Sequence, residues 1–320
     1  MLYKYVHPSS NPQINCWYID WHITDWCNYS CPYCIQTIDH HYASQPYESQ
    51  ELVEKYAKCI REKIKGRYIH LSLHGGEISQ YDLLSVCEIL FKNNNVVGTV
   101  NLTTNLSAPI EKYISFCEQN YGDKIKFKIV SSYHWTDLQK YIDKAKILAK
   151  NYKSFMVVSV VHDKITLEQM KVVAETFKEN KIPFKFTHGR IPNANGKLYK
   201  ISDECLEYLE KINSEFKIDN AKLIYSDGTT KVFKSRSNLL NQVATDLNLD
   251  GANFKGMYCF SGTIIYPSGK VYCGSCPDRK KMYKGLITDE NVSLSPTKEI
   301  CGGKGFCNLC DCMLIWSGKY

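Results

Sequence analysis

The sequence has no long hydrophobic run, and none of its 320 residues lies in an apolar stretch approaching the ~20 residues of a membrane-spanning helix. Its first fifteen residues also lack the apolar segment of a secretory signal, so we expect a cytoplasmic protein with no membrane partner. Internal repeats and low-complexity tracts are absent as well. A composition of 44% hydrophobic and 23% charged residues excludes a disordered chain, a collagen and a coiled-coil rod.

Charge of one sign is nowhere concentrated, although 40 basic and 33 acidic residues give a net charge of +7. The excess is spread over Lys-rich helix faces, which is typical of a solvated surface and only weakly favours an acidic partner. Because no basic patch or groove can be identified, the sequence does not predict a nucleic acid as substrate or partner.

Cysteine, by contrast, is abundant, with 15 residues where ordinary usage gives roughly five or six. A reducing cytosol makes disulfides a poor explanation, so the choice is between metal ligands and small core residues. Three cysteines lie close together near residue 30 and seven lie between residues 259 and 312. Cys16 is ambiguous, and four others fall in helical patterns and are predicted to be core residues: Cys59, Cys87, Cys117 and Cys205.

Residues 17 to about 215 alternate between β-branched or aromatic runs and longer Lys-, Glu- and Leu-rich helical stretches. Such alternation predicts parallel strands joined by right-handed crossovers, and six units suggest an α/β protein with a partial (β/α)6 TIM-like barrel. Its site would lie at the C-terminal ends of the strands. The predicted strands are 17–24, 68–73, 96–103, 125–130, 155–161 and 184–187, and the predicted helices are 49–65, 80–92, 109–120, 136–151, 166–180 and 202–216.

The pattern changes after the sixth helix. Residues 217–258 are polar and are expected to be irregular, whereas 263–266 and 270–272 flank a Pro-Ser-Gly turn and predict a hairpin. The sequence therefore suggests two domains, a barrel over 1–216 and a small cysteine-rich domain over 217–320.

A cysteine triplet, Cys27, Cys31 and Cys34, follows the first predicted strand with the spacing C-x3-C-x2-C. Thiolates suit iron–sulfur clusters and zinc, but a structural zinc site normally has four ligands. Three cysteines would leave one iron of a [4Fe–4S] cluster open to a small molecule. The alternative is a zinc site completed by His40 or His41.

This triplet, after the first strand of a βα-repeat chain, resembles the radical S-adenosylmethionine (SAM) enzymes. The resemblance implies that the three cysteines hold a [4Fe–4S] cluster and that SAM chelates its fourth iron. One electron would then cleave SAM to methionine and a 5′-deoxyadenosyl radical, which abstracts a hydrogen atom from the substrate. It also implies that Tyr33, just before the last cysteine, lies beside the adenine.

Further polar residues lie where strands two to six end. The Gly-Gly-Glu after strand two corresponds in this family to a site for the SAM amino group, and strand-end hydroxyls to sites for its carboxylate or ribose. The strand-end hydroxyls and the Thr-Asn pair could equally be ordinary polar residues of loops. Arg190 can pair bidentately with a carboxylate, but it could equally be a surface arginine. The candidate cofactor-binding residues are Tyr33, Gly75, Gly76, Glu77, Thr104, Asn105, Ser131, Ser132, Ser159 and Arg190.

The seven C-terminal cysteines also predict metal, with a zinc ribbon as the alternative. Their hairpin resembles the opening of the SPASM and twitch domains, C-terminal extensions of radical SAM enzymes that carry auxiliary clusters. Because the later spacing departs from SPASM, we expect one auxiliary [4Fe–4S] cluster, with two as the alternative. The candidate ligands are Cys259, Cys273, Cys276, Cys307 and Cys310, and Cys301 and Cys312 are candidate catalytic hydrogen-atom donors.

Taken together, the resemblance implies a radical SAM oxidoreductase or maturase. Enzymes with these extensions commonly modify ribosomally made peptides by crosslinking, epimerisation or oxidation, so we expect a peptide substrate. A small reductant protein of the flavodoxin or ferredoxin type would be the electron donor. The alternatives are a small-molecule dehydrogenase or carbon-skeleton enzyme and, more distantly, a zinc-ribbon binding protein without catalysis.

Overall fold

The computed structural model describes residues 3–7, 16–34, 48–122, 124–191, 198–216, 221–225, 230–233, 258–273, 283–295, 297–300 and 314–316. Contacts within the chain divide it into two units. One unit is Trp21–Phe216, and the other combines Met1–Asp20 with Lys217–Tyr320. The sequence did not indicate that the N-terminal segment belongs with the C-terminal part, and the predicted domain limits stay a prediction.

The alternating pattern of the sequence forms an α/β unit. Its sheet has the order β2-β3-β4-β5-β6-β7, and the neighbours from β3 to β7 are parallel. Each predicted strand and helix is present to within a few residues, which confirms the α/β class. The elements are β2 (Cys16–His22), α1 (Gln50–Ile64), β3 (Tyr68–His74), the short 3-10 helix η1 (Ile78–Gln80), α2 (Leu83–Phe91), β4 (Val97–Thr104), α3 (Ile110–Cys117), β5 (Ile125–Tyr133), α4 (Leu138–Asn151), β6 (Met156–Val161), α5 (Leu167–Glu179), β7 (Phe184–His188) and α6 (Asp203–Phe216).

The helices begin where the sequence supplies capping side chains. Ser49 accepts a hydrogen bond from the backbone of the first turn of α1, and Asp82 does the same for α2. Thr166 and Gln169 form a reciprocal capping box at the start of α5. These local signals explain why the helix starts were predictable within about three residues.

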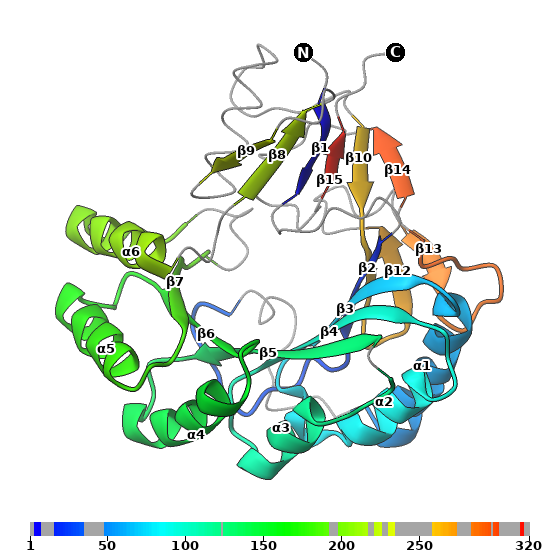
Figure 1. Ribbon diagram of the computed structural model, residues 1–320, viewed down its shortest axis with the longest axis horizontal. Helices are drawn as coiled ribbons and strands as arrows, with labels where there is room; N and C mark the ends of the chain where they lie inside the picture. Colours follow the sequence, from blue (N-terminus) through cyan, green and yellow to red (C-terminus); the bar gives the residue numbers. More distant parts are fainter. Residues whose placement is uncertain are drawn as a thin grey trace. The chain divides into compact units, whose positions relative to one another are not determined.

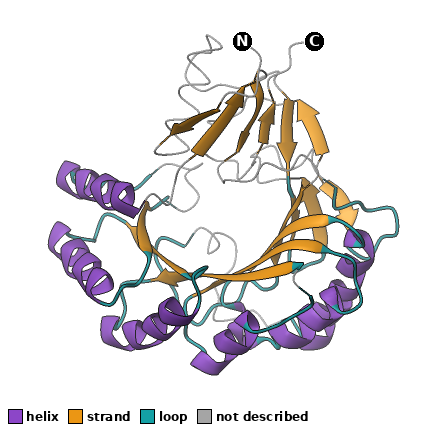
Figure 2. Cartoon of the chain, viewed as in Figure 1, coloured by secondary structure: helices purple, strands orange, loops and turns teal. Residues whose placement is uncertain are grey.

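Alternate residues of the strands are buried beneath the helices. Along β5 every second side chain from Ile125 to Tyr133 is buried, and Phe127 lies with its ring centroid 5.1 Å from Phe116 of α3 and 6.3 Å from Phe91 of α2. Figure 1 shows the sheet as a curved layer with helices α1–α5 along its outer side, and Figure 2 shows the same arrangement by element type. The other face of the sheet is therefore concave. The C-terminal ends of the parallel strands β3 to β7 lie at one edge of the sheet.

Two of the four cysteines assigned to the core are buried there. Cys87 on α2 and Cys205 on α6 are buried, whereas Cys59 on α1 and Cys117 on α3 are only half-buried. A helical position beside apolar neighbours therefore predicted the covered face correctly but not the depth of burial.

The second unit is built from antiparallel strands. Its larger sheet has the order β14-β10-β15-β1-β8-β9. The β8–β9 pair lies within residues 217–258, so the expectation that this stretch is irregular was partly wrong. The strands of this sheet are β1 (Tyr3–His7), β8 (Ala221–Tyr225), β9 (Thr230–Phe233), β10 (Tyr258–Ser261), β14 (Thr297–Ile300) and β15 (Leu314–Trp316). Three further strands, β11 (Thr263–Ile265), β12 (Lys270–Cys273) and β13 (Tyr283–Leu286), pair with one another in that order and follow β2 in the other sheet.

The predicted hairpin is confirmed as β11 and β12. Tyr266 donates its backbone N–H to the carbonyl of Lys270 at 2.9 Å, and Gly269 donates to the carbonyl of Tyr266 at 2.8 Å. Gly269 has φ +76°, a left-handed conformation that glycine adopts without steric cost.

Within the described part of the chain, no helix has the length and apolar character needed to cross a bilayer.

Candidate functional site

The segment after β2, which carries the cysteine triplet, lies directly against the turn that follows β3. Gly76 donates its backbone N–H to the carbonyl of Thr24 at 2.8 Å, and Glu77 donates to the carbonyl of Trp26 at 2.8 Å. We call residues 24–34 the cysteine loop. These two bonds continue the pairing of β2 with β3 beyond the sheet edge, so the Gly-Gly-Glu sequence supports the start of the cysteine loop.

Both glycines are required by this close approach. A Cβ atom on Gly76 would lie 1.8 Å from the carbonyl oxygen of Trp26, and one on Gly75 would lie 2.3 Å from that of Thr24. Gly75 also has φ +153°, which side-chain-bearing residues rarely adopt. No side chain fits at either position unless the cysteine loop moves away from β3.

The three cysteines of the loop are half-buried and close enough to influence one another. Burial raises the pKa of Cys27 to about 12, and the neighbouring Glu77, Cys34 and Cys31 add to this, while a backbone N–H from Tyr29 at 3.4 Å opposes it. Burial likewise raises the pKa of Cys31, with a further contribution from Cys34. Three thiolates gathered here would therefore repel one another unless a positively charged centre bound them.

Among the residues that the structure describes, no three His, Cys, Asp or Glu side chains are placed to hold one metal ion. His40 and His41, the zinc alternative, lie outside the described residues.

Glu77 is fully buried, and its carboxylate is used within the protein. Its Oε1 accepts hydrogen bonds from the backbone N–H of Ser79 at 3.0 Å and from the hydroxyl of Thr104 at 2.7 Å. Its Oε2 accepts from the backbone N–H of Asn105 at 2.6 Å. The carboxylate thereby ties the end of β4 to the end of β3. The predicted contact of this motif with the SAM amino group stays a prediction.

Asn105 is brought to the cysteine loop. Its Nδ2 donates to Oδ1 of Asn28 at 2.9 Å and lies 4.0 Å from Sγ of Cys27. Its own Oδ1 accepts the backbone N–H of Ser107 at 2.9 Å. The first cysteine and the end of β4 are therefore neighbours, as the Thr-Asn position suggested.

The other end of the cysteine loop is held by Tyr33 and two histidines. Tyr33 is 6% exposed, and its hydroxyl lies 3.0 Å from Nδ1 of His134. The Tyr33 ring stacks on that of His162 with centroids 4.6 Å apart, and on that of His134 at 5.9 Å. Burial raises the pKa of Tyr33, as do nearby Cys31 and Cys34, and burial lowers the pKa of His134 to about 4.

Sequence reasoning missed both of these histidines. His134 is the first residue after β5 and His162 the first after β6, so each stands at a strand end beside the loop. His162 directly follows its predicted strand, but the strand predicted before His134 ended at residue 130, three residues short of the end of β5, so the shared position was only partly visible in the sequence. A lone histidine after a strand is otherwise unremarkable in a sequence.

Two predicted hydroxyl residues lie on the wrong face of the sheet for contact with the cysteine loop. Ser131 is fully buried, and its hydroxyl lies 2.5 Å from that of Tyr141 on α4. Ser159 lies opposite Tyr133 of β5 in the sheet, and the ring of Tyr133 packs against α5. The buried hydroxyl of Ser159 has no hydrogen-bond partner among the described residues. Side chains alternate between faces along a strand, so only Ser132 of the predicted serines is turned to the concave side.

The remaining candidates lie on other segments of the chain or outside the described residues. Arg190 forms an isolated β-bridge with Leu198 just past β7. Cys259 lies on β10 opposite Glu299, and Cys273 is a buried residue at the end of β12. The rest, Cys276, Cys301, Cys307, Cys310 and Cys312, lie outside the described residues.

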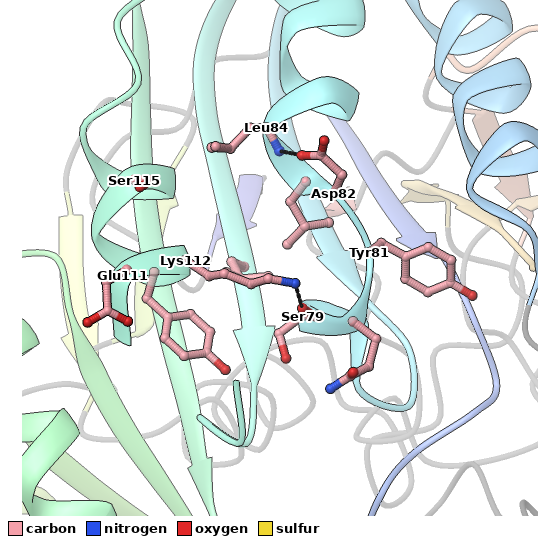
Figure 3. A pocket seen from close by; sticks show the side chains of 11 residues that line it. Ser79, Tyr81, Asp82, Leu84, Glu111, Lys112 and Ser115 are labelled. Carbon is pink, nitrogen blue, oxygen red and sulfur yellow. Dashed lines mark hydrogen bonds between the residues drawn. The ribbon is translucent and has the colours of Figure 1, made fainter. Parts of the chain in front are cut away.

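A cavity of about 370 Å³ lies elsewhere in the same unit, between η1, α2 and α3. In Figure 3 the ammonium of Lys112 crosses it to the backbone carbonyl of Ser79, at 3.0 Å, and Asp82 caps α2 at its border. Its lining includes Leu102, which belongs to the helix-covered face of β4. No residue of the cysteine loop lines it, so the cavity is not part of the candidate site.

No family model and no curated protein matches the sequence. Among solved structures, the chain aligns with anSMEcpe bound to AdoMet (S-adenosylmethionine) with a TM-score of 0.56 and 19% identity, over 86% of this chain and 78% of that one. The chain shares its fold with anSMEcpe. A second structure, native anSMEcpe with AdoMet and the Kp18Cys peptide, aligns over the same shares with a TM-score of 0.54 and 18% identity.

Proposed function

We propose that this chain is a radical SAM enzyme whose [4Fe–4S] cluster is held by Cys27, Cys31 and Cys34. One observation carries the proposal: the cysteine loop presents three mutually close thiols, seated on a Gly-Gly-Glu turn at the C-terminal edge of a parallel sheet. The shared fold with an AdoMet-bound enzyme supports the same function.

The residues present fit such a cluster. Bound there, the cluster would supply an electron that cleaves SAM to methionine and a 5′-deoxyadenosyl radical, the species that removes hydrogen from the substrate. The chain's own contribution is to preorganise the ligands. Gly75 and Gly76 allow the close approach, Asn105 holds the Cys27 end of the loop, and Tyr33 anchors the end that carries Cys31 and Cys34.

For the substrate we propose a peptide that is crosslinked, epimerised or oxidised, with a flavodoxin- or ferredoxin-type protein as electron donor in the cytoplasm. A neighbour of the same fold has been solved with a peptide and AdoMet bound, which supports this class. We also propose one auxiliary [4Fe–4S] cluster. Its ligands would come from Cys259, Cys273, Cys276, Cys307 and Cys310.

The test is to measure iron, sulfide and zinc in anaerobically purified protein and to assay SAM cleavage under reduction. A Cys27/Cys31/Cys34→Ala variant is compared with wild type, and Cys59/Cys117→Ala, which removes half-buried helix cysteines, serves as the control. We expect about eight irons in wild type and in the control, about four in the triple variant, and deoxyadenosine from the first two only.

Other outcomes would change the proposal in defined ways. About four irons with about one zinc in wild type would make the second unit a zinc site and leave the radical chemistry in place. Absence of iron and of SAM cleavage after reconstitution would refute the assignment. Deoxyadenosine formed in equal amounts with and without candidate peptides, but increased by a small molecule, would overturn the peptide substrate.

A further inference from the structure

The side-chain amide of Asn105 has a determined orientation. Its Oδ1 accepts the backbone N–H of Ser107 at 2.9 Å, and a backbone N–H can only donate. The Nδ2 group must therefore face the cysteine loop, where Oδ1 of Asn28 takes one hydrogen at 2.9 Å. Nδ2 also donates to Sγ of Cys27 at 4.0 Å, a long N–H···S contact.

The loop that carries this amide is fixed from several sides. Lys144 of α4 donates to the carbonyls of Leu106, Ser107 and Ala108 at 2.9, 3.3 and 2.7 Å. Leu106 has φ +58°, an uncommon conformation for a residue with a side chain, which these bonds hold in place. The loop between β4 and α3 thus cannot easily turn Asn105 away from the cysteine loop.

The start of the same loop is fixed by buried side chains. The hydroxyl of Tyr113 lies 3.1 Å from that of Thr104 and accepts the backbone N–H of Ala108 at 3.1 Å. Glu77 accepts the backbone N–H of Asn105 itself. These contacts from a helix and a strand hold the Asn105 side chain in one orientation, as the supporting residues of a functional site do.

We propose that Asn105 is a positioning residue that donates an N–H to the Cys27 sulfur and raises the reduction potential of the cluster bound there. The proposal rests on the proposed function. Cys27 already accepts one backbone N–H, from Tyr29 at 3.4 Å, and Asn105 supplies the donor that a substitution can remove. Hydrogen bonds to cluster sulfurs stabilise the reduced state because it carries one more negative charge.

The step affected is transfer of one electron. A reductant, here dithionite with viologen mediators, loses the electron, and the cluster goes from the 2+ to the 1+ state without a bond being made or broken. The measurement is a redox titration of the reconstituted full chain, followed by electron paramagnetic resonance. The signal that shifts on adding SAM identifies this cluster and separates it from an auxiliary one.

Two variants remove the donor in different ways. Asn105→Ser keeps an acceptor for the Ser107 N–H but is too short to reach Cys27, and Asn105→Asp replaces the N–H by a charged oxygen. We expect the reduced-to-oxidised ratio at a fixed potential to fall about threefold in the first. In the second it should fall about tenfold, which corresponds to ~59 mV for a one-electron couple.

The control is Asn101→Ser, another asparagine of β4, which is expected to leave the ratio unchanged. Equal potentials in wild type and both Asn105 variants, at equal iron content, would overturn this inference and leave the radical SAM assignment intact. A wild-type protein that takes up no cluster at all would overturn the proposed function, and this inference with it. A lower iron content in the Asn105 variants with unchanged potential would assign Asn105 a purely structural role, against the proposal.

Discussion

At the scale of single residues, Glu77 is a carboxylate used as a structural acceptor. All three of its partners donate, so neither oxygen can be replaced by an NH2 group without placing two donors against each other. Burial makes this conflict costly, because an unsatisfied buried polar group costs about 1–3 kcal/mol. Although glutamine has nearly the same volume as glutamate, we therefore expect Glu77→Gln to lower the stability of the fold.

We predict that Glu77→Gln lowers the unfolding free energy of the metal-free protein by about 2 kcal/mol, measured by urea denaturation. Glu51→Gln, an exposed glutamate in the first turn of α1, is the matched control and should change it by less than about 0.5 kcal/mol. Equal stability of the two variants would mean that the Glu77 network contributes nothing net to the fold.

Tyr33 and His134 form the second residue-scale contact that can be measured. Their hydrogen bond joins the cysteine loop to the end of β5, and such a bond contributes about 1 kcal/mol. A double-mutant cycle with Tyr33→Phe and His134→Gln isolates this term, because the loss of stacking on His134 is the same with tyrosine and with phenylalanine and cancels in the cycle. We predict a coupling of about 1 kcal/mol in urea unfolding, and additive effects would show that the pair does not interact.

At the scale of elements, the important contact is that of the cysteine loop with the turn after β3. The hydrogen bonds from Gly76 and Glu77 leave no space for a side chain between the two segments. A methyl group at Gly76 must therefore push the loop off β3, and with it the first cysteine. The glycine acts on the metal ligands through backbone geometry alone.

We predict that Gly76→Ala reduces iron at the Cys27/Cys31/Cys34 site at least fivefold, measured after anaerobic reconstitution, while the helical circular dichroism is retained. Gly66→Ala is the control, because a Cβ atom at Gly66 has nothing within 4 Å although its φ of +68° makes the change unfavourable. Normal iron in both variants would show that the loop adapts to the added methyl group.

Elements also mark the limit of sequence reasoning. The triplet and the Gly-Gly-Glu sequence are local motifs, so their positions at strand ends could be predicted from spacing alone. The faces of Ser131 and Ser159 depend on strand parity, and an error of one residue in the register reverses the face. The pairing of Tyr33 with His134 joins residues about a hundred positions apart, which only the order of strands in the sheet determines.

At the scale of the whole molecule, the α/β unit was predictable because its helix caps and alternating strands are repeated signals. The second unit was less so. In its larger sheet, β1 pairs with β8 and β15, which lie more than 200 residues later in the sequence. No local sequence pattern predicts pairing over such a distance. The same reason explains why β8 and β9 were expected to be irregular, since short strands without clear alternation resemble loops.

Two half-buried histidines make the stability of the protein depend on acidic pH. Burial lowers the pKa of His74, at the end of β3, to about 4, as it does for His134, from an ordinary value of 6.5. In the unfolded chain both histidines take up protons as the pH falls through 6.5, whereas in the folded chain they stay neutral until about pH 4. Protonation therefore favours the unfolded state across this range, and stability falls as the pH falls.

We predict that the unfolding free energy of the metal-free protein drops by about 3 kcal/mol between pH 7 and pH 4 through these two groups, a figure reduced for their partial exposure. The measurement is urea unfolding at a series of pH values. His134→Gln should remove about half of the slope between pH 6.5 and 4.5, because glutamine does not titrate, and it should change stability at pH 7.5 by a constant amount. An identical slope in wild type and variant would show that His134 is protonated equally in the folded and unfolded chains, and the burial that Tyr33 and the cysteine loop provide would then not exclude water from it.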